Sequence, residues 1–387
     1  MIYRRFGRTN IELSQLGFGA MRFPLIDEND PTTIDEREAA KMLHYAIDHG
    51  VNYIDNAYPY HRQASEVFVG KALKGGYRHR VYLATKMPVW LVKSKGDSQK
   101  YFDEQRSRLH TDTIDMYLLH SLDKNAWETV KKYDVLDFLD GVLQSGEIRF
   151  AGFSYHDELP LFKEIVDAYP WTLCLIHLNY VDDHHQAGLE GLEYAAGKGM
   201  AVMIMEPMRG GKLANNVPKP VLDIIAQTGR KQTPAEFALR WILNRPEVGC
   251  VLSGMSSMKQ VEENIRFASE EHVNTLTPAE LELYAQARAF YRARTKVNCT
   301  QCGYCMPCTQ GISISFIMEL YNDAVMYNAV EDSSWMYKVF IKPENNAGAC
   351  TECGECEEKC PQKIPIIESL KEAHRSLKSN TSIYPLS

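Results

Sequence analysis

Short apolar runs alternate with amphipathic segments along the first three quarters of the chain. Each apolar run is rich in β-branched or aromatic residues and is typical of a buried strand, whereas each amphipathic segment repeats its apolar residues with a helical period. The predicted strands lie at residues 15–20, 51–55, 81–86, 114–119, 148–153, 173–179, 200–205 and 249–253. The predicted helices lie at residues 35–49, 63–74, 98–110, 126–145, 158–168, 188–198, 219–244 (broken at Gly229 and Pro234) and 258–269.

Eight strands, each followed by a helix, predict an α/β fold, the (β/α)8 TIM barrel. The alternative is an open doubly wound sheet, but no Gly-x-Gly-x-x-Gly joins a first strand to a first helix. A hairpin at residues 2–13 precedes the barrel, and a helix at 278–293 ends it. We therefore predict a barrel domain at 1–293, a second domain at 294–377 and a polar tail at 378–387.

Composition and charge narrow the function classes. The chain has 387 residues, of which 45% are hydrophobic and 24% charged, as in globular proteins with ample core. The net charge of -7 gives no indication of a basic surface, so we expect no nucleic-acid partner. No apolar run approaches the about 18 residues of a membrane helix, and no signal-peptide apolar region follows the basic N-terminus. We therefore expect no membrane partner and a cytoplasmic location.

Titratable side chains follow three successive predicted strands. Asp55 and Tyr60 follow one strand, Lys86 ends the next, and His120 follows the third. Because the carboxyl ends of barrel strands meet on one face, we expect these four side chains to be neighbours. Tyr58 competes with Tyr60 for the same position.

The four side chains are suited to protonating an oxygen. A nearby ammonium lowers the pKa of a phenol, so Lys86 would make Tyr60 a better acid. Asp55 would keep Lys86 charged through an ion pair. His120 would donate a hydrogen bond to a substrate oxygen or pass a proton to Tyr60. The set predicts reduction of a carbonyl by hydride.

Residues 1–293 resemble the aldo-keto reductase superfamily. The resemblance rests on Asp55-Asn56-Ala57-Tyr58-Pro59-Tyr60, Ala84-Thr85-Lys86, the segment 114–120 and Glu262-Glu263-Asn264-Ile265. It implies that Asp55, Tyr60, Lys86 and His120 form the family's catalytic tetrad, and its five-residue step from Asp to Tyr selects Tyr60 over Tyr58.

The resemblance also implies a nicotinamide cofactor, NADP or NAD, lying across the strand ends. The matching positions are Ser154, Tyr155, His177, Glu206, Met208, Gly211, Ser253, Gly254, Ser256, Gln260, Glu263 and Asn264. Some depart from the family pattern: Tyr155 stands where Asn is common, and His177 where Gln is common. Gly254 and Gln260 replace the basic residues that usually hold a 2′-phosphate, so the choice between NADPH and NADH stays open.

Eight of the ten cysteines lie in one short region. Four of them, at 350, 353, 356 and 360, fit the bacterial ferredoxin spacing C-x2-C-x2-C-x3-C-P. Cys299, Cys302, Cys305 and Cys308 nearly repeat it, which predicts two [4Fe-4S] clusters. One would be held by Cys299, Cys302, Cys305 and Cys360, and the other by Cys308, Cys350, Cys353 and Cys356. Zinc is the alternative. The two remaining cysteines, Cys174 and Cys250, are expected to be core residues.

The intervening segment, 312–342, predicts two helices, at 315–327 and 333–341, as in a helical ferredoxin-type domain. The leading hypothesis is an oxidoreductase that interconverts a small-molecule carbonyl and an alcohol. The first alternative is an electron-transfer component whose barrel docks a redox protein partner or a flavin, and the second is a nucleotide-sensing module. Trp90, Trp127 and His61 lie on predicted rim loops and are candidates for the substrate pocket.

Overall fold

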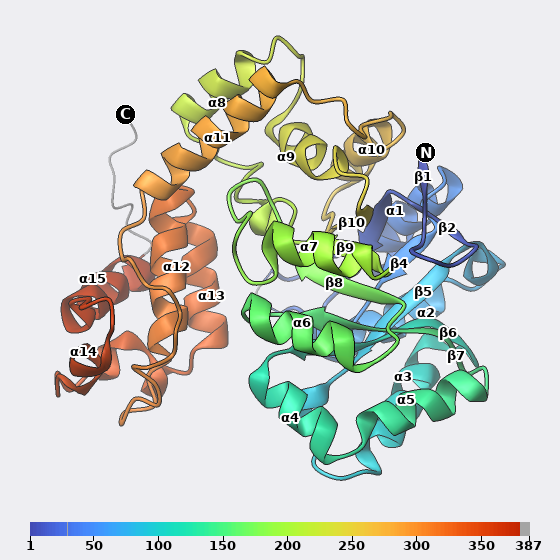
Figure 1. Cartoon of the computed structure of the whole chain (residues 1–387), viewed down its shortest axis with the longest axis horizontal. Helices are drawn as coiled ribbons and strands as arrows, with labels where there is room; N and C mark the ends of the chain where they lie inside the picture. The colour runs from blue at the N-terminus through green and yellow to red at the C-terminus, as the bar shows by residue number, and fades with distance from the viewer. Residues whose placement is uncertain (29, 380–387) are drawn as a thin grey trace. The chain divides into compact units, whose positions relative to one another are not determined.

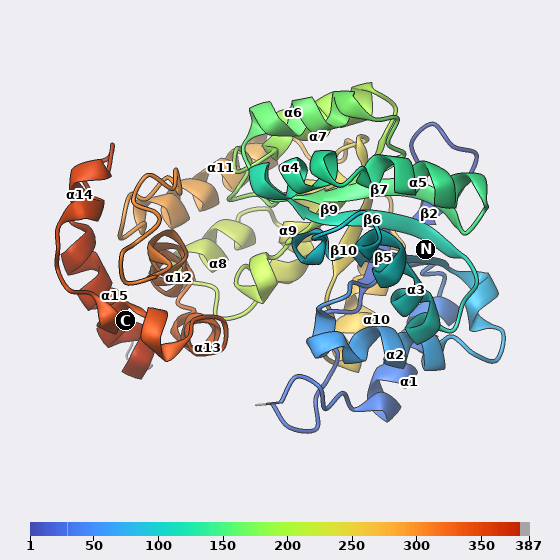
Figure 2. The same ribbon diagram turned by 90° about the horizontal axis from the view of Figure 1, so that it is seen from below.

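The structure is a computed structural model that describes residues 1–28 and 30–379; residues 380–387 of the predicted tail lie outside the described residues. Within them, eight parallel strands close into a barrel in the order β10-β3-β4-β5-β6-β7-β8-β9, with helices around it (Figures 1 and 2). The predicted (β/α)8 barrel is confirmed. The barrel strands are β3 (Leu16–Gly19), β4 (Tyr53–Asp55), β5 (Tyr82–Met87), β6 (Ile114–Leu122), β7 (Ile148–Tyr155), β8 (Leu173–His177), β9 (Ala201–Met205) and β10 (Val248–Ser253).

The register of the first strands explains why polar side chains gather at one end. Asp55 on β4 pairs with Ala84 on β5, and Lys86 on β5 pairs with Leu118 on β6. Because side chains two residues apart share a face, Lys86 follows Ala84 and His120 follows Leu118 on the inner face of the barrel. Ala84 and Leu118 both belong to the apolar cluster inside the barrel. The predicted site residues therefore form the layer above that core.

A hairpin closes the opposite end of the barrel. Its strands β1 (Tyr3–Arg5) and β2 (Glu12–Ser14) pair antiparallel, as the sequence predicts. Phe6 and Leu13 join the apolar cluster inside the barrel. A Cβ on Gly7 would lie 2.7 Å from the Ala201 nitrogen at the start of β9, so only glycine fits this close approach. The amino-terminal mouth is thus plugged, and the open mouth is the one that carries the polar layer.

The helices of the barrel follow the predicted order with one exception. They are α1 (Glu36–Asp48), α2 (Ala64–Ala72), α3 (Asp97–Leu109), α4 (Lys124–Lys132), α5 (Val135–Gln144), α6 (Leu159–Ala168), α7 (Gly188–Gly197), α9 (Pro234–Leu243) and α10 (Met258–Phe267). The single helix predicted at 126–145 is two helices, because Asp134 adopts a left-handed conformation with φ +53° and breaks the hydrogen-bond ladder. The apolar spacing on both sides of Asp134 is helical, so the pattern did not reveal the break.

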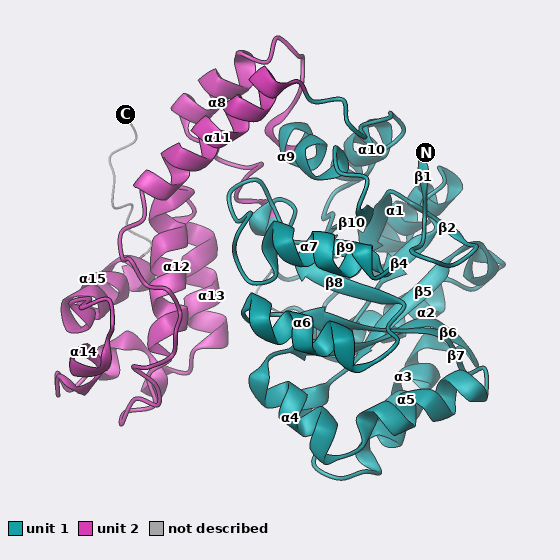
Figure 3. Cartoon of the chain, viewed as in Figure 1, with its two compact units in different colours: residues 1–210, 236–276 teal, residues 211–235, 277–387 magenta. Residues whose placement is uncertain are grey.

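The chain divides into two compact units, shown in different colours in Figure 3. Unit 1 consists of Met1–Gly210 and Glu236–Leu276, and unit 2 of Gly211–Ala235 and the chain from Thr277 onward. The helices of unit 2 are α8 (Lys219–Ala226), α11 (Pro278–Ala293), α12 (Ile314–Met326), α13 (Val330–Phe340), α14 (Glu355–Lys359) and α15 (Ile366–Ser379). The domain boundary at 293/294 stays a prediction; in the structure α8 and α11 belong to the same unit as α12 to α15.

Unit 2 has its own apolar core. Ile317, Leu320 and Ala324 of α12 pack with Leu370 and Leu377 of α15. These residues recur at helical spacing on both elements, so each helix turns one face inward. α12 and α13 match the helices predicted in the segment 312–342, whereas α14 and α15 were not predicted. Across the described residues, no helix is both long and apolar enough to cross a bilayer.

Candidate active site

Lys86 is the centre of a buried polar cluster at the open mouth of the barrel. Its Nζ donates to Asp55 Oδ1 at 2.6 Å, to the Asn56 carbonyl oxygen at 2.8 Å and to the Tyr60 hydroxyl at 3.3 Å. The Lys86 and Asp55 side chains are 1% and 2% exposed, so both charges are removed from water and must compensate each other. The structure therefore brings the predicted aspartate, lysine and tyrosine together.

The backbone between β4 and α2 decides which tyrosine reaches Lys86. Tyr60 begins a short 3-10 helix, η1 (Tyr60–Gln63), in which His61 adopts a positive φ of 51°. Tyr58 points elsewhere: its hydroxyl donates to Glu104 Oε2 at 3.1 Å, and the Arg108 guanidinium lies over its ring at 4.6 Å. Tyr60 is thus the phenol beside the ammonium.

Burial, rather than the ammonium, sets the direction of the Tyr60 pKa. Burial raises the pKa of Tyr60 above 10, and the opposing effect of Lys86 does not overcome it. The expectation of a phenol with a lowered pKa is therefore wrong. Burial alone would lower the pKa of Lys86, but Asp55 and Tyr60 raise it above its ordinary value. The cluster holds a neutral phenol beside a charged amine.

His120 completes the cluster as a neutral imidazole. Burial lowers its pKa well below 6.5, and the charge of Lys86 lowers it further. Its ring lies edge-on to Tyr60 with 6.2 Å between centroids, and 5.2 Å from the ring of Trp90. Among the described residues, His120 Nδ1 is buried without a hydrogen-bond partner. A neutral ring suits the predicted role of hydrogen-bond donor to a substrate oxygen.

A second buried network fixes the end of β5. Gln105 of α3 donates to the Lys86 carbonyl oxygen at 3.0 Å and to Glu66 Oε1 at 2.6 Å, and it accepts from the Tyr117 hydroxyl at 2.7 Å. The Thr85 hydroxyl also donates to Glu66 at 2.7 Å. These bonds hold the backbone of Lys86 from the helix side. No sequence pattern indicates this support, since its members come from four separate segments, α2, β5, α3 and β6.

Of the other rim candidates, only Trp90 adjoins the cluster. It is 46% exposed and packs on His120. Trp127 is buried on α4 and donates from Nε1 to Glu164 at 2.8 Å. His61 is buried and bonded on both ring nitrogens, to the Phe23 amide and the Pro31 carbonyl oxygen.

The predicted cofactor positions on β7 and β8 differ in what they contact. Ser154 Oγ accepts from the Ser121 amide at 2.7 Å. The Tyr155 ring packs on Phe162 of α6 at 5.1 Å, and its hydroxyl donates to the Glu158 carbonyl oxygen, so the structure does not bring this side chain to the tetrad. Its presence where the family carries Asn is explained by packing.

His177 belongs to a charged network that the sequence did not reveal. Its Nε2 lies 2.9 Å from Asp182 Oδ2, and Arg209 is ion-paired to the same carboxylate. Burial alone would raise the pKa of Asp182, but Arg209 and His177 lower it well below its ordinary value. Asn179 also donates to Asp182 at 3.0 Å. The network links the end of β8 to the loop after β9.

The predicted phosphate end of the site lies after β9 and β10. Ser253 accepts from Asn264 at 3.0 Å, and the Ser256 amide donates to Gln260 at 2.8 Å. Glu206 adopts a positive φ of 54° directly after β9. Glu263 lies 3.8 Å from Lys259 on α10. Of the remaining positions, Met208 and Gly254 lie in unit 1, and Gly211 lies in unit 2.

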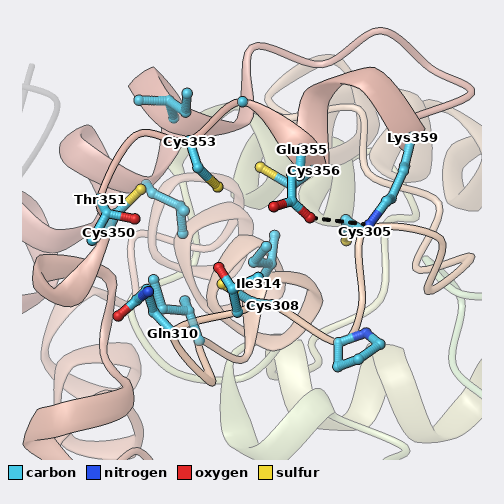
Figure 4. Close-up of a pocket in the computed structure, with 16 residues that line it drawn as sticks. Cys305, Cys308, Gln310, Ile314, Cys350, Thr351, Cys353, Glu355, Cys356 and Lys359 are labelled. Atoms are coloured by element: carbon cyan, nitrogen blue, oxygen red, sulfur yellow. Dashed lines mark hydrogen bonds and ion pairs between the residues drawn. The ribbon is translucent and has the colours of Figure 1, made fainter.

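The eight clustered cysteines surround two pockets of unit 2. Cys308, Cys350, Cys353 and Cys356 line one pocket, as Figure 4 shows. Cys299, Cys302 and Cys360 line the other, and Cys305 borders both. This division follows the predicted pairing, in which each short motif lends one thiol to the other's site. No three ligating side chains of the described residues are arranged to hold a single metal ion.

The two other cysteines are core residues, as predicted. Cys174 on β8 and Cys250 on β10 are both 0% exposed. Burial raises the pKa of both thiols, so they carry no thiolate at neutral pH.

Comparisons with known proteins agree with both parts of the chain. Residues 15–280 match the model of the aldo/keto reductase family, and residues 298–364 match that of a 4Fe-4S dicluster domain. The oxidoreductase YqkF of Bacillus subtilis is 27% identical over 309 residues, covering 70% of this chain and 94% of that protein. L-galactose dehydrogenase of Arabidopsis thaliana is 28% identical over 292 residues, covering 69% and 88%.

The solved structures give the same result. The holo form of the aldo-keto reductase AKR11C1 from Bacillus halodurans is similar with a TM-score of 0.60 and 25% identity. The match covers 74% of this chain and 96% of that one. The ranges matched by the two family models do not overlap, so the dicluster domain follows the aldo/keto reductase domain in the chain.

Proposed function

Because the chain belongs to the aldo/keto reductase family, we propose that it is a nicotinamide-dependent oxidoreductase that interconverts a small-molecule carbonyl and an alcohol. The observation that carries the proposal is the Lys86 ammonium, which bonds Asp55 on one side and the Tyr60 hydroxyl on the other. A reductase needs an acid beside the oxygen on which charge develops, and this arrangement supplies one.

We assign the proton transfer to Tyr60. In the direction of reduction, the Tyr60 hydroxyl gives its proton to the carbonyl oxygen. A nicotinamide held at the rim would supply the hydride to the carbonyl carbon. The phenolate that this leaves lies 3.3 Å from the Lys86 ammonium, which stabilises it. Asp55 holds the ammonium in place at 2.6 Å. In the direction of oxidation the same phenolate takes the proton back.

His120 is assigned to orient the substrate. As a neutral imidazole it has one N–H to donate, and its Nδ1 finds no partner among the described residues. A hydrogen bond to the carbonyl oxygen would direct that oxygen toward Tyr60, and the partly exposed Trp90 beside His120 would form an apolar wall. Two relatives are named for sugar chemistry, L-galactose dehydrogenase and 6-dehydroglucose reductase, so aldoses belong in any substrate panel.

The residues along the rim fit a dinucleotide. Ser154, next to the last residue of β7, accepts from the amide that follows His120, and His177 ends β8. Ser253 at the end of β10 and Asn264 on α10 form a hydroxyl–amide pair. We propose that the first two residues hold the nicotinamide end and the other two the adenosine end. Both NADPH and NADH remain candidate cofactors, because neither Gly254 nor Gln260 carries a positive charge that could bind a 2′-phosphate.

We further propose two [4Fe-4S] clusters in unit 2. The support is the separation of the eight thiols into two pockets that match the ferredoxin spacing. Hydride carries two electrons and each cluster accepts one, so the clusters do not take part in the hydride step. We assign them to the folding of unit 2, where Cys360 is part of the apolar core.

The test is reduction of aldehydes, ketones and aldoses by the variant Tyr60→Phe. We expect kcat to fall by about 10²–10⁴-fold, the usual contribution of a positioned acid. Binding of NADPH or NADH, measured by fluorescence titration, should be unchanged because the ring remains.

The matched control is Tyr58→Phe, which removes a hydroxyl bonded to Glu104 outside the tetrad. Its kcat should stay within about twofold of the wild type, well below the effect expected for a lost acid. If Tyr60→Phe and Tyr58→Phe reduced the same carbonyl at equal rates, the assignment of Tyr60 would be wrong.

A further inference from the structure

Arg22 lies across the rim of the barrel between the ends of two strands. It follows β3 and is exposed. A Cβ placed on Gly254, just after β10, would lie 3.2–3.3 Å from Arg22 Cβ, Cγ and Cδ. A Cβ placed on Gly210, in the loop after β9, would lie 2.8 Å from Arg22 Nη2. The stem of Arg22 therefore passes over one glycine, and its guanidinium ends over the other.

The guanidinium of Arg22 is unengaged. In residues 1–28 and 30–379 it takes part in no hydrogen bond and no ion pair, whereas Arg209 on the same rim is ion-paired to Asp182. A guanidinium presents a planar fork of donors that matches phosphate and carboxylate oxygens. An unpaired guanidinium on the rim of a proposed anion-binding site indicates that an anionic ligand binds to this guanidinium.

Gly210 and Gly254 leave space for the Arg22 side chain on the rim. Gly210 has φ +65°, a conformation that favours glycine, and Gly254 is kept small by the stem of Arg22 itself. Gly254 is also the position where the family resemblance implies a basic side chain. Arg22, in the loop after β3, lies beside Gly254 because closure of the barrel pairs β3 with β10.

The position along the rim distinguishes the phosphates of a dinucleotide. The Glu206 Oε2 would lie 3.8 Å from the same Gly210 Cβ, and its charge acts on Tyr60, so the guanidinium is on the reacting side of Gly254. Gln260 and Asn264, at the proposed adenosine end, lie on α10. Arg22 is therefore between the reacting end and the adenosine end, where the diphosphate bridge would lie.

We propose that Arg22 binds the diphosphate of the nicotinamide dinucleotide, the part common to NADPH and NADH. This inference rests on the proposed function, since it takes the rim to be a dinucleotide site. A substrate carboxylate would offer the fork similar oxygens, and the experiment separates the two sources.

The experiment measures equilibrium binding of ADP, adenosine, NADH and NADPH to the full chain by isothermal titration calorimetry. Arg22→Ala should weaken ADP, NADH and NADPH by a similar factor of about 10–100, as expected for lost charge-assisted hydrogen bonds. Adenosine, which has no phosphate, should bind both proteins equally. Arg22→Lys, which keeps the charge but loses the fork, should fall between the two.

Lys259→Ala is the matched control, because it removes an exposed cation on α10 whose nearest acid is Glu263 at 3.8 Å. It should leave the binding of ADP and NADH unchanged. Because Arg22 makes no hydrogen bond or ion pair with the residues that the structure describes, its variants should melt at the wild-type temperature.

Several outcomes would overturn the proposal. A loss confined to NADPH would make Arg22 a 2′-phosphate ligand, and unchanged ADP binding with a raised KM for acidic substrates would make it a carboxylate ligand. Unchanged binding of every ligand would remove it from the site. If the wild type bound neither ADP nor dinucleotide, the proposed function would fail together with this inference, whereas wild-type binding with an unaffected variant would refute the inference alone.

Discussion

At the scale of single residues, Lys86 and Asp55 form a buried ion pair that belongs to the candidate active site and whose desolvation opposes folding. Both side chains are nearly free of solvent, and neither charge has another charged partner within the cluster. Removing one member of a buried pair leaves the other uncompensated, which is far more costly than removing both. The stability and the activity of this pair should therefore respond differently to substitution.

We expect Lys86→Met to lower the free energy of unfolding of the barrel by about 3–5 kcal/mol, because Asp55 then stays buried without a partner. The double variant Asp55→Asn with Lys86→Met should recover most of that loss, yet both should lack reductase activity. Urea unfolding followed by tryptophan fluorescence gives the free energies. As a control, Lys71→Met removes an exposed ion pair with Glu36 and should cost less than about 1 kcal/mol. Equal losses in the two single variants would contradict the buried-pair argument.

Single residues also show which features of the site could be predicted from the sequence and which could not. The tetrad was predictable because each member follows a recognisable strand and the register of a barrel aligns strand ends. Arg22 was not predictable, since its neighbours Gly210 and Gly254 are known only once β10 closes onto β3. The direction of the Tyr60 pKa was missed because it depends on burial, which the ammonium beside it does not outweigh.

At the scale of elements, hydrophobic periodicity located the barrel strands and most helices. It failed where a break has no apolar signature, as at Asp134 between α4 and α5. It also missed α14, a five-residue helix that contains Cys356 of the cysteine motif, and α15, which begins six residues after the last cysteine. The predicted helix at 278–293 is present as α11, where a capping box forms: the Glu280 side chain accepts from the Thr277 amide at 2.9 Å.

The contacts of His61 with the loop after β3 predict how the free energy of unfolding depends on pH. His61 of η1 accepts from the Phe23 amide at 3.3 Å, and its other nitrogen donates to the Pro31 carbonyl oxygen at 2.8 Å, so the ring is neutral in this arrangement. Burial lowers the pKa of His61 below 6.5, an effect that the bond to Pro31 only partly offsets. Above about pH 6.5 both folded and unfolded states are neutral here, and the full stability is present.

As the pH falls below about 6.5, the unfolded chain binds a proton at this histidine before the folded protein does, so the free energy of unfolding decreases. Below the folded pKa the effect levels off. One such group contributes at most about 1.4 kcal/mol per pH unit. His61→Gln, which does not titrate, should flatten the pH dependence between pH 7 and pH 5 in chemical unfolding. An unchanged slope would show that His61 does not gain its proton on unfolding.

At the scale of the whole molecule, unit 2 combines a small apolar core with two thiol-lined pockets. We expect Cys353→Ser to lose about half of the bound iron, because one of two clusters loses a ligand. Thermal unfolding should show unit 2 destabilised, since cluster binding is coupled to folding. Iron and sulfide analysis of anaerobically purified protein provides the measurement. Cys174→Ala, a buried thiol on β8, should retain all of the iron; equal iron in both variants would refute the ligand assignment.

The interleaved course of the chain through its two units has a consequence for gene architecture. Segment Gly211–Ala235 belongs to unit 2, although the chain returns to the barrel for Glu236–Leu276 before completing that unit. Inside unit 2, α8 of this segment packs on α11, and the buried Lys212 is ion-paired to Asp323 at 2.9 Å and to Asp332 at 3.2 Å. A stop codon placed before residue 277 would thus remove α11 from α8, and Asp323 and Asp332 from Lys212. The coding segments of the two units are interleaved in the gene, so truncation at a single position cannot separate unit 1 from unit 2.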